Sequence, residues 1–102
     1  MPDVRQAQKV LVKRILEGDG KASPSERRAA FNNTGLAEPL GTLVDKVAKQ
    51  AYRVTDEDVT AAKVSGLSED QVFEILVCAA VGQATRQYET AFAALKDATG
   101  KE

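Results

Sequence analysis

Apolar residues recur along this chain at spacings of three and four, which is the period of an α-helix with one buried face. The pattern divides into five segments, which we predict to be helices at about residues 4–17, 24–32, 39–52, 56–64 and 69–96. No stretch shows the apolar and polar alternation that is typical of a half-buried strand. The sequence therefore predicts a single all-α domain over residues 1–102.

Capping and turn residues indicate where these helices begin and end. Ser23 precedes a proline and a glutamate that favour a helix start. The segments 54–59 and 67–72 each place a hydroxyl between two apolar residues, followed by an acidic first turn. Gly66 can adopt the left-handed conformation that ends a helix. Gly82 lies inside the last helix, where it indicates either a close helix crossing or a slight break.

The last predicted helix has two different halves. Within residues 72–81 only Glu74 is charged, so this half is apolar on all sides. We expect other helices or a second subunit to surround it, and we place the subunit interface there. In the second half Val81, Tyr88 and Leu95 recur every seven residues, together with two alanines and a phenylalanine. This spacing predicts an ordinary core stripe.

Charge and composition exclude several classes of partner. Lys and Arg total 14 against 15 Asp and Glu, so the net charge is −1 and nucleic acid is not an expected partner. The pairs Lys13-Arg14 and Arg27-Arg28 are interpreted as solvated helix faces. The longest apolar run, residues 75–81, is far shorter than the roughly 20 residues of a membrane span. The N-terminus shows no apolar signal core, so we expect a cytoplasmic protein.

The residue inventory also limits the chemistry. The chain has no histidine and one cysteine, so it has no internal disulfide and no Ser-His-Asp or Cys-His pair. The usual nitrogen and sulfur ligands of zinc and copper are lacking as well. No nucleotide-binding or zinc-protease motif occurs. We therefore expect no cofactor and no metal, and we assign no catalytic residue.

The order of motifs in the second half of the chain resembles one known family. The motifs are KVA at 46–48, AY at 51–52, VTDED at 54–58, GLSEDQVFE at 66–74 and AAVG at 79–82. Over residues 40–95 this order is similar to the carboxymuconolactone decarboxylase and alkyl hydroperoxidase D superfamily. The resemblance implies an orthogonal bundle of five to six helices of the alkyl hydroperoxidase D-like type, assembled into dimers, trimers or hexamers.

The sequence departs from the redox-active members of that family. Those members carry a Cys-x-x-Cys pair and a histidine on the helix before the glycine turn, whereas residues 49–58 here contain neither. Dithiol chemistry needs an attacking and a resolving thiol, so dithiol peroxidase activity is not expected. No catalytic residue can be transferred from the family to this chain.

Four residues remain as candidates for a pocket or an interface. Glu74 and Cys78 lie one turn apart on the last helix. A carboxylate beside a thiol in an apolar setting raises the thiol pKa, so we expect Cys78 to be an inert core residue. Glu74 is interpreted as a structural ion pair with a basic residue of another helix, such as Lys46 or Arg53, or with an arginine at a subunit interface; otherwise it is an exposed side chain. Alternatively, a raised pKa would make it a general base.

The other two candidates precede the glycine turn. Tyr52 and Arg53 lie beside the acids at 56–58, where the redox relatives carry their site. The helix dipole is sufficient to explain these acids, because carboxylates in the first turn stabilise a helix. They lack the regular spacing and central glycine of a calcium loop, so metal binding is not expected there.

Three functions are compatible with these observations. The first is a non-redox member of the family that acts as an oligomeric accessory or small-ligand-binding module. The second is a decarboxylase- or isomerase-type enzyme that uses Glu74, Tyr52 or Arg53 on a small organic acid between subunits. The third is an unrelated helical bundle whose ligand is a partner helix. We favour the first, with self-association and a possible small organic ligand as its interactions.

Overall fold

The computed structural model describes residues 4–99, and in this range it is all-helical, without strands. The α-helices are α1 (Val4–Glu17), α2 (Pro24–Asn32), α3 (Leu40–Gln50), α4 (Asp56–Val64) and α5 (Glu69–Thr99). A turn of 3-10 helix, η1 (Ala51–Arg53), connects α3 to α4. The bounds lie close to the expected ones, except that α3 gives way to η1 after Gln50 and α5 continues to Thr99.

Side-chain caps fix where three of these helices, α2, α4 and α5, begin. The hydroxyls of Ser23, Thr55 and Ser68 each accept a hydrogen bond from the backbone N–H three residues later, at 3.1, 3.2 and 3.1 Å. Such a cap satisfies a donor that the first turn of a helix would otherwise leave free. The apolar residues that flank the last two caps lie in the core or pack against it: Val54, Val59, Leu67 and Val72.

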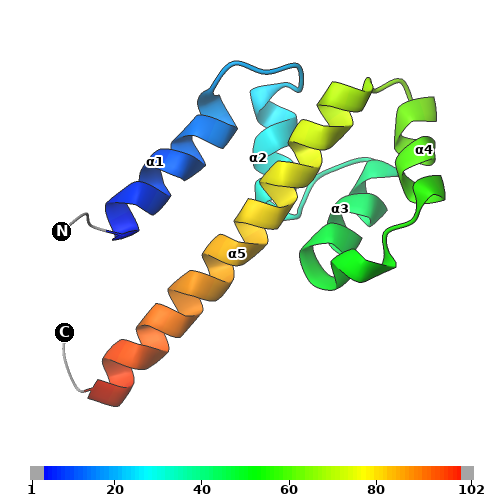
Figure 1. The fold of residues 1–102 in the computed structure, drawn as a ribbon. Helices are drawn as coiled ribbons and strands as arrows, with labels where there is room; N and C mark the ends of the chain where they lie inside the picture. Colours follow the sequence, from blue (N-terminus) through cyan, green and yellow to red (C-terminus); the bar gives the residue numbers. More distant parts are fainter. Residues whose placement is uncertain (1–3, 100–102) are drawn as a thin grey trace.

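The long helix α5 is the element around which the other four pack. In Figure 1, α1 and α2 lie on one side of it, and α3 and α4 lie on the other. The most deeply buried large side chains are Leu43, Val44, Ile75 and Cys78, from α3 and α5. The side of the apolar first half of α5 that carries Ile75 and Cys78 is therefore covered by helices of its own chain, whereas Phe73 is 67 % exposed.

The second half of α5 differs from the sequence prediction. Its expected core stripe lies mainly outside the core: Leu95 is 59 % exposed, and Val81 and Tyr88 are only partly buried. α2, α3 and α4 are too short to cover it, because nine residues of α2 span about 14 Å whereas the 31 of α5 span about 46 Å. α1 lies against one side of it, where the side chain of Gln8 donates a hydrogen bond to Thr85. In Figure 1 this half extends beyond α2, α3 and α4, which makes the described molecule 51 Å long and 28 by 22 Å across.

Gly82 marks a close helix crossing, and α5 continues unbroken through it. A β-carbon at this position would overlap with the backbone carbonyl oxygen of Phe31, near the end of α2. The guanidinium of Arg86, one turn further along α5, donates a hydrogen bond of 2.6 Å to the same carbonyl. α5 thus contacts the C-terminal end of α2 directly, which fixes how the two helices pack.

None of the helices described between residues 4 and 99 combines the length and the apolar character needed to cross a membrane.

Candidate functional site

A cleft of about 240 Å³ lies between the end of α1, the loop that follows it, α2 and the first half of α5. Its lining combines two guanidinium groups, two carboxylates, a thiol and three apolar side chains. These residues are Arg14, Ile15, Asp19, Arg27, Phe73, Glu74, Val77 and Cys78. Two of the four residues singled out in the sequence, Glu74 and Cys78, are therefore brought together here.

Glu74 binds the backbone just before α2. Its carboxylate accepts hydrogen bonds from the N–H of Lys21, at 2.8 and 2.9 Å, and from the N–H of Ala22, at 2.9 Å. The hydrogen bonds from Ala22 and then Lys21 lower the pKa of Glu74, with a smaller contribution from the charge of Arg27. Glu74 is therefore ionised at neutral pH.

Two sequence interpretations of Glu74 are thereby corrected. The carboxylate does not pair with Lys46 or Arg53, because it binds the backbone of the loop before α2, whereas Lys46 pairs with Asp58 and Arg53 contacts Gln50. Its pKa is lowered and not raised, because backbone N–H groups stabilise the charged form. A carboxylate held in this way is a poor general base near pH 7.

Arg27 is the residue of the cleft that the sequence analysis missed. It is only 6 % exposed, whereas the pair Arg27-Arg28 was interpreted as a solvated face. Its Nη1 donates to the carbonyls of Ile15, at 3.2 Å, and Gly18, at 2.7 Å, at the end of α1. The signal was present in the sequence, since Arg27 lies three residues before Ala30 on the apolar face of α2.

The Arg27 guanidinium has donors that are not used. Its Nε is buried and has no hydrogen-bond partner among the residues that the structure describes. Its Nη2 likewise makes no hydrogen bond within residues 4–99. Buried polar groups in native proteins are almost always paired, so this guanidinium is an exception that calls for an explanation.

Cys78 is placed in the core, as expected. It is 1 % exposed, and its Sγ lies 3.6 Å from the carbonyl oxygen of Ile15. Burial raises the pKa of the thiol, and the charge of Glu74 raises it further, while Arg27 opposes both. A protonated, enclosed thiol is not a nucleophile.

We expect a thiol reagent to label Cys78 in the native protein at least about a hundredfold more slowly than in denaturant, because reaction requires local opening. The rate of thiol modification at neutral pH measures this directly. Equal rates in the two conditions would contradict the buried position of Cys78.

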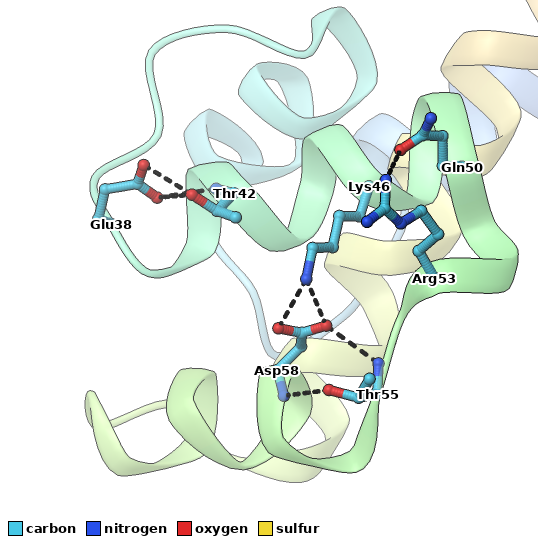
Figure 2. Close-up of polar contacts among 7 residues, drawn as sticks. All are labelled: Glu38, Thr42, Lys46, Gln50, Arg53, Thr55 and Asp58. Atoms are coloured by element: carbon cyan, nitrogen blue, oxygen red, sulfur yellow. Dashed lines mark hydrogen bonds and ion pairs between the residues drawn. The ribbon is translucent and has the colours of Figure 1, made fainter.

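Tyr52 and Arg53 do not line the cleft. Both lie in η1, where Tyr52 is 84 % exposed. The Nη1 of Arg53 donates to Oε1 of Gln50 at 3.3 Å, as Figure 2 shows. The structure thus separates these two candidates from Glu74 and Cys78.

A polar network connects α3 to the start of α4 (Figure 2). The Nζ of Lys46 donates to both carboxylate oxygens of Asp58, at 2.9 and 3.1 Å. The backbone N–H of Thr55 donates to Asp58 at 3.0 Å. Lys46 and then Thr55 lower the pKa of Asp58. Helix capping and one ion pair therefore account for this carboxylate.

A metal centre is not formed by the part of the chain that the structure describes. Within residues 4–99, no three carboxylate or thiol side chains gather closely enough to hold an ion.

The cleft is better suited to binding than to catalysis. Arg14 and Arg27 offer charge-assisted hydrogen bonds, and Phe73 and Val77 offer apolar contacts. Glu74 and Cys78, the titratable groups nearest to a catalytic role, are held in unreactive states. Comparison with protein-family models, with curated proteins and with solved structures finds no match to this chain. Function is therefore inferred from the chemistry of the cleft itself.

Proposed function

We propose that this chain is a non-redox helical module that binds a small organic acid in the cleft between α1, α2 and α5. The unused donors of Arg27 carry this proposal. A carboxylate in the cleft would accept a charge-assisted hydrogen bond from Nη2, which makes none within residues 4–99, whereas Nε is enclosed by the protein. The side chain of Arg14 also lines the cleft, is exposed and makes no hydrogen bond within residues 4–99, so it is free to turn toward the same anion.

The charge of the lining favours a monoanion. Arg14 and Arg27 are balanced by Asp19 and Glu74, so the four charges sum to zero. A phosphate or a dicarboxylate would bring excess negative charge close to the two carboxylates, which is unfavourable. A single carboxylate can instead pair with the guanidinium groups while Glu74 remains bound to the backbone.

The size of the cleft limits the ligand to a small molecule. A volume of 240 Å³ corresponds to about eight water molecules at roughly 30 Å³ each. It lies slightly below the usual range of drug-sized sites, about 300–1,000 Å³. Ile15, Phe73 and Val77 would contact an apolar body of this size. Benzoate is therefore a suitable probe, and benzyl alcohol is its neutral analogue.

We expect benzoate to bind with a dissociation constant of about 1 mM or below, and more tightly than benzyl alcohol. Arg14→Gln should weaken benzoate binding at least about tenfold, because it removes a charge-assisted hydrogen bond. The matched control is Arg28→Gln, which changes an exposed arginine of α2 that pairs with Glu17 outside the cleft. Chemical-shift titration of the three proteins gives the dissociation constants.

Equal binding of benzoate and benzyl alcohol would contradict the assignment of an anion site. Equal losses of benzoate affinity in Arg14→Gln and Arg28→Gln would contradict the same assignment.

The proposal extends to the fold type and to self-association, as the family resemblance implies. The order of α3, the capped helix α4, the Gly66 turn and the long α5 supports it, since Gly66 takes a positive φ of 114°. The exposed second half of α5 also favours contact with a further protein surface. The enzyme alternative receives no comparable support, because Tyr52 lies outside the cleft and Glu74 is held by the backbone.

A further inference from the structure

An uninterrupted seven-residue repeat follows the exposed side of α5. It comprises positions 73, 77, 80, 84, 87, 91, 94 and 98, which alternate spacings of four and three. Phe73 and Val77 come first, Gln87 lies near the centre, and the other five positions are alanines. All are exposed except the half-buried Val77, and none is charged. We call these eight positions the α5 seam; their spacing is that of the contact line between two paired helices.

The described helices of this chain leave the α5 seam largely uncovered. The buried residues of α5, which include Val72, Ile75 and Ala79, lie on the opposite side of the helix. The radius of gyration is 15.4 Å, whereas a closely packed domain of this length has about 13 Å. The seam is therefore an accessible surface about 38 Å long, given a rise of about 1.5 Å per residue.

We propose that the α5 seam pairs antiparallel with the α5 seam of a second copy of this chain. The distribution of side-chain sizes points to this occupant. Antiparallel pairing places Phe73 opposite Ala98 and Val77 opposite Ala94, so that each large side chain meets a small one. Parallel pairing would set Phe73 against Phe73 and leave a gap between the alanines at the other end.

The absence of charge on the α5 seam supports the same occupant. When two uncharged seams pair, no charged group is buried, so there is no free-energy cost of desolvating an ion. A strip about 38 Å long and about 10 Å wide covers on the order of 400 Å² per copy. This is below the roughly 800 Å² per partner of a stable complex, so the dimer is a reversible one.

Pairing would also complete the cleft. Phe73 and Val77 belong both to the α5 seam and to the lining of the cleft. In the antiparallel arrangement the partner's Ala94 and the partner's Ala98 lie over these two residues. The exposed seam side of the second half of each α5 thereby covers the cleft of the other copy. This consequence rests on the proposed binding function, whereas the pairing itself does not.

Sedimentation analysis of the ligand-free protein tests the pairing. At about 100 µM we expect a concentration-dependent dimer, and Ala91→Lys should weaken it at least about tenfold, because it places a charge in the seam. The matched control is Ala93→Lys, since Ala93 is equally exposed on the same helix but lies outside the seam. A wild type that stays monomeric at about 1 mM, or equal effects of the two substitutions, would overturn the proposal.

Cross-linking tests the direction. The antiparallel register places position 80 opposite position 91 of the partner, within the roughly 7 Å that a disulfide can bridge. A mixture of Ala80→Cys and Ala91→Cys proteins should form the mixed disulfide under mild oxidation. Ala80→Cys alone should not cross-link, because the two copies of position 80 lie about 16 Å apart along the axis. Cross-linking of Ala80→Cys alone would overturn the antiparallel arrangement. Benzoate takes no part in either experiment, so failure of the ligand site is distinguished from failure of the pairing.

Discussion

Replacing Gly82 with alanine is expected to lower the free energy of unfolding by about 3 kcal/mol, the upper part of the range for overpacked cores. Helix propensity alone predicts the opposite, since alanine stabilises a helix interior by roughly 1 kcal/mol relative to glycine. The added methyl group would overlap with the carbonyl of Phe31, and a backbone atom cannot turn away as a side chain can. α2 and α5 would have to separate.

Urea denaturation of the wild type and Gly82→Ala measures this difference. Ala84→Gly is the matched control, because Ala84 is an exposed position on the same helix. It should cost only about 1 kcal/mol, the effect of propensity alone. A Gly82→Ala variant as stable as the wild type would show that α2 and α5 do not cross closely.

Glu74→Gln is expected to cost about 2 kcal/mol at neutral pH, because it removes the charge from an acceptor of three backbone hydrogen bonds. The amide nitrogen would also face a backbone N–H group of Lys21 or Ala22. Two hydrogen-bond donors would then point at each other, which is unfavourable. Glu89→Gln is the control: Glu89 forms an exposed ion pair with Arg5, and such pairs contribute about 0–1 kcal/mol. Urea denaturation at pH 7 compares the two variants.

The same residue gives a defined pH dependence. The pKa of Glu74 is lower in the folded chain than its ordinary value of 4.5. The ionised form therefore stabilises the fold fully above that ordinary value, and the stabilisation is lost as the pH falls through the folded-state pKa. Between neutral pH and the acid range, the stability of the wild type should fall more steeply than that of Glu74→Gln. Parallel pH profiles would contradict the role of Glu74.

Helix positions were predictable from the sequence because their signals are local. The hydroxyls of Ser23, Thr55 and Ser68 each accept a hydrogen bond from the backbone N–H three residues later. Gly66 adopts a positive φ, which glycine does without steric cost. The environment of α5 was less predictable, because the seven-residue spacing of Val81, Tyr88 and Leu95 indicates an apolar face without specifying what covers it. That depends on how far the shorter helices extend along α5.

The candidate site was predictable in part. Glu74 and Cys78 share a face of one helix, which a spacing of four residues dictates. Their partners come from α1 and from the loop before α2, more than fifty residues away in sequence, and no local pattern specifies that contact. The apolar-face position of Arg27 was visible in the sequence, but its contact with the end of α1 follows only from the fold.

We propose that the cleft between α1, α2 and α5 holds a small carboxylate against Ile15, Phe73 and Val77. Nuclear Overhauser effects between the ring protons of bound benzoate and the protein test this claim most directly. We expect contacts to the methyl groups of Ile15 and Val77 and to the ring of Phe73. Contacts confined to residues outside the cleft, or none at saturating benzoate, would contradict it.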